Sequence, residues 1–209
     1  NLNNKNATAL KLNGAINAGN VTVSASAHQG GEASSNTFLI KDSLIEHGTD
    51  ASKRNLITSA YVYSPIDVDR NDGETVANFN QNRIIIENSD IKSGDTHNIA
   101  IMGVYLVGSL GSNVDALSPF EANQNAVFIK GSDLDLNSLY VTYNVGTSTM
   151  KSSASDNVLW VEDSNLNVNF IKSKEASGTS IIGSVSIVGS QAFNEQNDNV
   201  LHLKNTKIE

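Results

Sequence analysis

The chain has 209 residues, a formal net charge of −8 at pH 7 and no cysteine. Its length suffices for one large domain with a sizeable core, and its negative charge argues against nucleic acid and anionic membrane surfaces as partners. The absence of cysteine excludes disulfides, thiolate metal sites and cysteine nucleophiles. No apolar stretch reaches about 18 residues, so no transmembrane segment is predicted.

A ten-residue phrase is repeated along the chain. Its five clear copies occupy residues 36–45, 82–91, 125–134, 157–166 and 199–208, at spacings of 46, 43, 32 and 42 residues. A degenerate sixth copy, TALKLNGAI, starts at Thr8. A fixed phrase at a variable spacing predicts a fixed structural unit whose connecting loops differ in length.

The copies share residue types at equivalent positions, or columns. The third, fifth and tenth columns are apolar in all five copies, and the seventh holds Asp, Asn or Gly. Alternating apolar residues predict a strand with one buried face, and Asp, Asn and Gly favour a tight corner. The first and eighth columns are polar and nearly invariant: Asn36, Asn82, Asn125, Asn157 and Asn199 in the first, and Ser43, Ser89, Ser132, Ser164 and Thr206 in the eighth. Each copy therefore predicts strand, corner, strand.

A second apolar segment follows each unit, at residues 21–25, 56–63, 99–107, 139–145 and 181–188. These segments are rich in β-branched and aromatic residues and have no helical period, so they predict a third strand per repeat. Long polar stretches between repeats predict protruding loops at residues 64–81, 109–124 and 190–198.

Stacking one coil per repeat predicts an all-β fold, a single-stranded parallel β-helix of five to six coils. Equivalent residues then lie about 4.8 Å apart along the axis, so the Asn and Ser columns can form hydrogen-bonded ladders. The sixth column alternates in charge, which places opposite charges at neighbouring steps. This column consists of Lys41, Glu87, Lys130, Glu162 and Lys204.

The phrase N-x-φ-x-φ-x-[D/N/G]-[S/T]-x-φ, where φ is apolar, resembles the right-handed parallel β-helical passenger regions of bacterial autotransporters and large surface adhesins. The resemblance covers nearly the whole chain and implies an extracellular protein of the bacterial cell surface. It also implies that residues 1–209 form one β-helix segment of a longer passenger. It implies no catalytic residue, because the matching positions are structural.

Two candidate sites are formed by residues that the copies of the phrase do not share. Asp67, Asp69, Asn71 and Asp72 lie in DVDRNDGE and offer oxygen ligands for calcium, although Asp72 stands where an EF-hand has glycine. The alternative is a solvated acidic turn without a cofactor. The fourth column, which includes Ile85, Phe128 and Trp160, is expected to face outward and bind a partner. The alternative is that a loop covers it.

These features predict a stalk or adhesin segment that presents loops to a protein or glycan on host or neighbouring cells. A subunit of a self-stacking surface filament, associating through the ends or sides of the solenoid, is one alternative. A carbohydrate-active β-helix enzyme of the lyase or tailspike type is another. We expect no enzyme, because no row of acids recurs at equivalent strand positions.

Overall fold

The computed structural model describes the parts of the chain that form strands and corners. They are residues 2–3, 10–12, 22–23, 34–47, 55–63, 77–93, 99–107, 120–145, 150–168, 182–188, 193–195 and 197–209.

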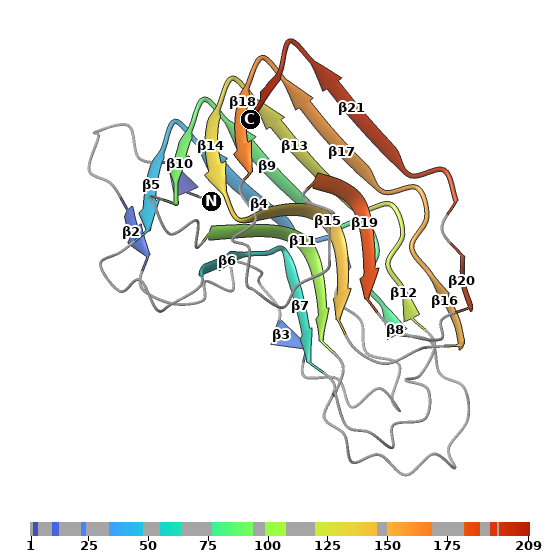
Figure 1. The fold of residues 1–209 in the computed structure, drawn as a ribbon. Helices are drawn as coiled ribbons and strands as arrows, with labels where there is room; N and C mark the ends of the chain where they lie inside the picture. Colours follow the sequence, from blue (N-terminus) through green and yellow to red (C-terminus); the bar gives the residue numbers. More distant parts are fainter. Residues whose placement is uncertain are drawn as a thin grey trace, which may run out of the picture.

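These residues form strands and no helix, and every strand pairing is parallel (Figure 1). Sheet 1 contains β1 (Leu2–Asn3), β4 (Thr37–Lys41), β9 (Arg83–Glu87), β13 (Ala126–Lys130), β17 (Val158–Glu162) and β21 (Val200–Lys204). Sheet 2 contains β2 (Leu10–Leu12), β5 (Leu44–His47), β10 (Asp90–Lys92), β14 (Asp133–Leu136), β18 (Asn165–Val168) and β22 (Lys207–Ile208). The prediction of an all-β fold is confirmed, and its sheets are parallel.

Two further sheets complete the arrangement. Sheet 3 contains β3 (Thr22–Val23), β7 (Ala60–Tyr63), β11 (Ile99–Val107), β15 (Ser138–Val145) and β19 (Ile182–Val188), with β6 (Asn55–Ile57) paired to β11. Sheet 4 contains β8 (Ala77–Asn78), β12 (Phe120–Glu121), β16 (Met150–Ser153) and β20 (Phe193–Glu195). Between residues 120 and 145 the chain passes through sheets 4, 1, 2 and 3 in that order.

The repeated phrase is stacked in register. Ile84 pairs with Phe38 of the preceding repeat and with Val127 of the following one, and each of these residues occupies the third column. Ile86, in the fifth column, is fully buried, whereas Arg83, in the second column, is exposed. Alternation of inward and outward side chains therefore holds along these strands, as the period-two pattern predicts.

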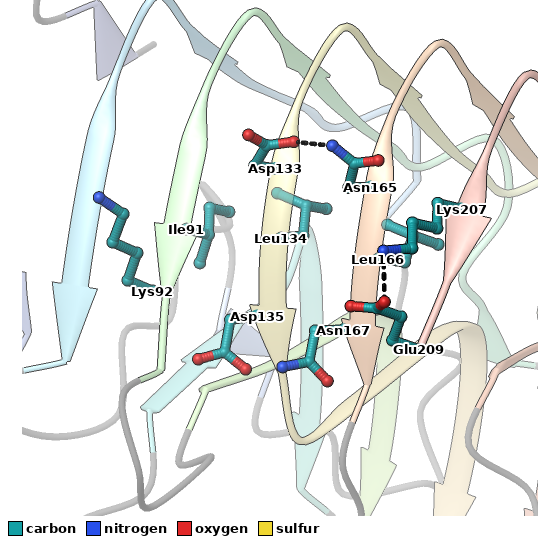
Figure 2. Close-up of a pocket in the computed structure, with 10 residues that line it drawn as sticks. All are labelled: Ile91, Lys92, Asp133, Leu134, Asp135, Asn165, Leu166, Asn167, Lys207 and Glu209. Carbon is teal, nitrogen blue, oxygen red and sulfur yellow. Dashed lines mark hydrogen bonds and ion pairs between the residues drawn. The ribbon is translucent and has the colours of Figure 1, made fainter.

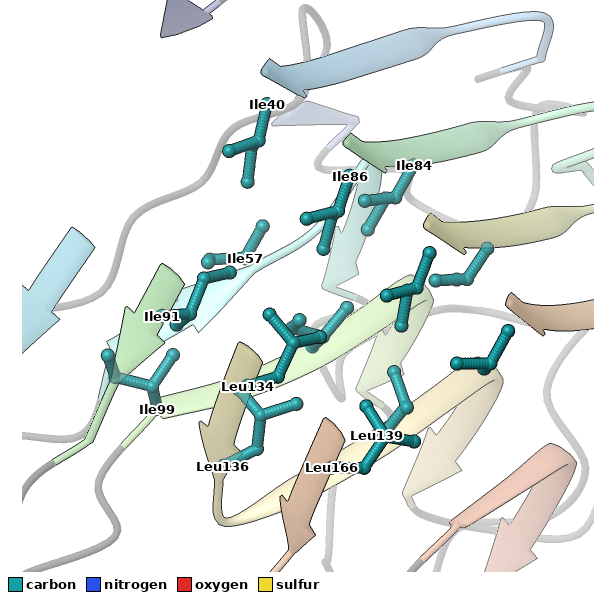
Figure 3. Close-up of a cluster of buried hydrophobic side chains, with 14 of the residues drawn as sticks. Ile40, Ile57, Ile84, Ile86, Ile91, Ile99, Leu134, Leu136, Leu139 and Leu166 are labelled. Atoms are coloured by element: carbon teal, nitrogen blue, oxygen red, sulfur yellow. The ribbon is translucent and has the colours of Figure 1, made fainter. Parts of the chain in front are cut away.

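The interior is a continuous cluster of aliphatic side chains from sheets 1, 2 and 3 (Figure 3). Ile86, Ile91 and Ile99 come from three different sheets, and all three are fully buried. Burying an aliphatic side chain of this size contributes about 1.5–3 kcal/mol relative to leaving it in water. The stack of apolar columns thus supplies the main driving force for folding.

Each repeat has two corners in left-handed backbone geometry. The seventh column has positive φ at all five copies: Asp42, Asn88, Gly131, Asp163 and Asn205. The residue immediately before the Asn column has the same geometry in every copy: Ser35, Gln81, Gln124, Asp156 and Asp198. The first set matches the predicted corner, whereas Gln is an uncommon residue at positive φ and the second corner was not predicted.

A third bend lies inside sheet 3, where β11 and β15 turn (Figure 1). The pairing of β11 with β15 skips Gly103, and a Cβ at that position would lie 2.5 Å from the carbonyl oxygen of Val141. The carbonyl oxygen of Gly103 accepts hydrogen bonds from the backbone N–H of Ser59 at 3.0 Å and from its Oγ at 2.6 Å. Glycine is therefore required for close approach of the two backbones.

Two sequence-based boundaries were wrong. Residues 10–12 pair with β5 in sheet 2, so the copy assigned from Thr8 was placed in the wrong strand, and Leu2–Asn3 supply the sheet 1 strand instead. The pattern LKL fits either strand, because both alternate. The predicted loops also extend too far: residues 77–78, 120–121 and 193–195 belong to sheet 4, and Phe79 is only 2% exposed.

Candidate binding surface

The fourth column lies on the outer side of sheet 1. Ile85, Phe128, Trp160 and His202 pair in successive strands β9, β13, β17 and β21. Trp160 is 36% exposed, whereas Ile85 and Phe128 are partly buried. The structure therefore brings the three predicted binding residues into one row, in which Trp160 is the most exposed of the three.

Trp160 also has an internal partner that the sequence did not suggest. Its ring stacks on that of His202, with ring centroids 3.6 Å apart and planes at 14°. One face of the indole is thus covered by imidazole. A partner approaching from outside sheet 1 therefore could not stack on that face of Trp160.

Beside this row runs the charged sixth column. Lys41 donates a hydrogen bond to Glu87 at 2.8 Å, and Glu162 lies 3.7 Å from Lys130 and 3.5 Å from Lys204. The hydrogen bond and the charge of Glu87 raise the pKa of the exposed Lys41 above its ordinary value of 10.5. Charges along this column are therefore partnered along the stack instead of forming a patch of one sign.

The Asn column forms a ladder in which the backbone takes part. The backbone N–H groups of Asn36, Asn82, Asn125 and Asn157 donate to the side-chain oxygen of the next Asn, at 2.8–3.1 Å. Asn36 and Asn157 add a second bond from their side-chain amides. Three members of the column, Asn82, Asn125 and Asn157, are fully buried. These side chains satisfy backbone groups where the chain turns into sheet 1.

The corner serines use a related arrangement. The backbone N–H groups of Ser43, Ser89 and Ser132 donate to the hydroxyl of the next repeat at 3.1 Å. Each hydroxyl in turn donates to the carbonyl two residues earlier, as Ser132 does to Lys130 at 2.9 Å. Thr206 keeps this second bond, to Lys204. The predicted Ser positions thus act mainly through the backbone.

A second polar ladder was missed. It runs through Ser34, Asn80, Asn123, Ser155 and Asn197, two residues before the Asn column. Here the later repeat donates to the earlier one, as when the N–H of Asn123 donates to Asn80 Oδ1 at 2.7 Å. This direction is opposite to that of the Asn column. The sequence does contain a signal for this ladder, because the pattern [N/S]-x-N is present in all five repeats.

A shallow depression lies on sheet 2, with a volume of about 210 Å³ (Figure 2). Asp133, Asp135, Asn165 and Asn167 line it in two neighbouring rows, and Asn165 donates to Asp133 at 2.6 Å. Lys207 and Glu209 form an ion pair at its edge. The sequence analysis did not identify this region.

The calcium prediction falls on Asp67, Asp69, Asn71 and Asp72, which lie outside the described residues. In the parts of the chain that are described, no group of three or more His, Asp or Glu residues is arranged to hold a metal ion. The same parts contain no helix long and apolar enough to cross a membrane.

Comparison of the chain with protein-family models, with curated proteins and with solved structures found no match.

Proposed function

We propose that the chain is a segment of an extracellular β-solenoid on a bacterial cell surface, a stalk or adhesin that binds a protein or glycan of another cell. The single observation that carries this proposal is how the repeated residues are used. The Asn and Ser columns bond to neighbouring repeats, and the third, fifth and tenth columns form the core. The features that recur therefore serve stacking.

What differs between repeats is then available for recognition. The connections between sheets 3 and 4 differ in length, and the outer row carries Ile85, Phe128 and Trp160. Binding residues are commonly found on loops held by a rigid scaffold. The surface location is supported by the resemblance of the repeated phrase to autotransporter passengers, and the closed path of a β-helix is supported by the strand order in residues 120–145.

Adhesion can be tested with beads coated with the purified chain. Coated beads should attach to cultured epithelial cells or to bacterial cells more often than albumin-coated beads do. Deleting residues 66–75 should reduce attachment severalfold while the far-UV circular dichroism stays unchanged. The deletion stops short of β8 because Phe79 is buried.

The matched control is Asp133→Asn, an exposed change on sheet 2 that should leave attachment unchanged. Attachment no greater than that of albumin beads, on both kinds of cell, would refute the adhesive function. Attachment that survives the deletion but is lost in Trp160→Ala would place the contact on the outer row.

A further inference from the structure

The outer side of sheet 1 presents three rows of side chains, one from each outward column of the repeated phrase (Figure 1). Strands β4, β9, β13 and β17 supply four members to each row, and each of these strands is paired on both sides. The second column holds Thr37, Arg83, Ala126 and Val158, the fourth holds Leu39, Ile85, Phe128 and Trp160, and the sixth holds Lys41, Glu87, Lys130 and Glu162. Neighbouring strands therefore surround every one of these positions.

The middle row is apolar although it points away from the core. Trp160 is 36% exposed, and Ile85 and Phe128 are partly buried. Ile84 and Ile86, which flank Ile85 in β9, are fully buried. An outward row of large aliphatic and aromatic side chains leaves water only when a second surface covers it. This row is thus the apolar centre of a candidate contact surface.

The charged row beside it restricts which partner fits. Lys41, Glu87 and Lys130 alternate in sign from one coil to the next, and Glu162 continues the alternation. Successive charges are about 4.8 Å apart along the stack. A partner carrying charges of one sign would meet a like charge at every second step, which is unfavourable. The fitting partner alternates at the same spacing, and the sixth column of a second copy of this chain does so.

Two copies can place these surfaces face to face about a twofold axis parallel to the strands. The two stacks then run in opposite directions, so that each column faces itself with the order of its coils reversed. An axis through β13 would set Lys130 against Lys130, and Glu87 against Glu162 of the second copy. An axis between two strands sets lysine against glutamate instead. Charge therefore selects an axis that lies between strands.

Side-chain size selects the axis between β9 and β13. The outward positions of β9 then face those of β13 in the second copy: Arg83 faces Ala126, Ile85 faces Phe128 and Glu87 faces Lys130. Arg83 is exposed, whereas Ala126 is 5% exposed and has the smallest side chain of its column, so the long side chain fits over the short one. The neighbouring axes lack this match, because they set Arg83 against Thr37 or Ala126 against Val158.

We propose that the outer side of sheet 1 binds a second copy of this chain, antiparallel to the first, about a twofold axis between β9 and β13. At the ends of the contact, Trp160 faces Leu39 and Glu162 faces Lys41 of the second copy. Only the outward residues of four strands per copy take part, fewer than the roughly 20–30 residues a side of a standard interface, so the dimer is weak. This inference goes beyond adhesion to cells, because the dimer forms from the purified chain alone.

Sedimentation equilibrium of the purified 209-residue chain tests the proposal. A monomer–dimer equilibrium should be measurable up to about millimolar concentration, the range of weak interfaces. Glu87→Lys should weaken dimerization about 10-fold, because it sets two lysines together at both symmetry-related points. Lys130→Glu should do the same with two glutamates. An equimolar mixture of these two variants should regain the dimerization of the unaltered chain, because every contact across the axis again joins lysine to glutamate.

The matched control is Lys92→Glu, which reverses an exposed charge on sheet 2 and should leave dimerization unchanged. Amide NMR of the unaltered chain supplies a readout without substitutions: signals that shift on dilution should lie on β4, β9, β13 and β17. A chain that stays monomeric at millimolar concentration would refute the proposal. So would a mixture that dimerizes no better than either variant alone, or dilution shifts confined to the other sheets.

Discussion

Replacing Asn157 with Leu tests whether the Asn column stabilises the stack through its buried acceptors. Asn157 and Asn125 are both fully buried, and Asn157 Oδ1 accepts the backbone N–H of Asn125 at 3.0 Å. The hydroxyl of buried Thr142 also donates to this oxygen, at 3.4 Å. Leu branches at Cγ as Asn does but has no acceptor, so both donors would lose this partner inside the protein.

A buried donor left without an acceptor costs about 1–3 kcal/mol. The Asn125 amide carries most of this cost, and the longer bond from Thr142 adds less, so we expect a total loss of about 2–4 kcal/mol. For a domain of this size, that loss lowers Tm by roughly 5–15 °C. Urea denaturation followed by circular dichroism measures the free energy, and amide exchange should accelerate at Asn125.

The matched control is Asn167→Leu on the exposed side of β18. A surface change of this kind should alter stability by no more than about 0.5 kcal/mol. If Asn157→Leu and Asn167→Leu unfold at the same urea concentration, the buried ladder does not contribute as argued. An unchanged exchange rate at Asn125 would lead to the same conclusion.

Three further predictions concern the core, the corner and the charged column. Ile86→Asp places a carboxylate at a fully buried position and should abolish the cooperative thermal transition, whereas Ile85→Asp on the outer row should not; similar melting curves would refute the assigned register. Gly131→Ala should cost about 1–2 kcal/mol in urea titrations, because Gly131 has φ of +58° and a Cβ would lie 2.8 Å from Asn88 Oδ1; an unchanged midpoint would contradict this. Lys41→Met should remove a contribution to the free energy of unfolding that is complete below pH 10.5 and is lost as the pH rises further, because folding raises the pKa of Lys41. If the stability difference between the wild type and this variant stays constant through this range, the ion pair is not its cause.

Much of the fold could be predicted because two simple signals agree. Alternation in residues 82–86 and 125–129 identifies strands and their inward faces, and Asp, Asn or Gly in the seventh column identifies a corner. Both signals reflect local backbone geometry, which a short segment specifies by itself.

Other features could not be predicted because they depend on contacts between repeats. Sheet 4 has strands of two to four residues, too short for a recognisable alternation. The left-handed geometry at Gln81 and Gln124 accompanies backbone N–H bonds to Asn123 and Ser155 in the next repeat. Gln by itself does not favour that geometry.

The candidate surface shows the same division. The sequence placed Ile85, Phe128 and Trp160 in one outward column, and the strand pairing aligns them. Stacking of Trp160 on His202 depends on the side-chain orientations of two neighbouring strands, which the pattern does not specify.

The sequence by itself determined the two strands that flank the repeated corner, which side of each is apolar and where that corner lies. The tertiary structure decided the direction of each hydrogen-bonded ladder and the degree to which each column is buried. Phe128 and Trp160 occupy the same place in the repeated phrase, yet the first is partly buried and the second is 36% exposed. The physical reason is that a strand in a parallel stack is covered by its neighbours on both sides, and a local pattern does not contain those neighbours.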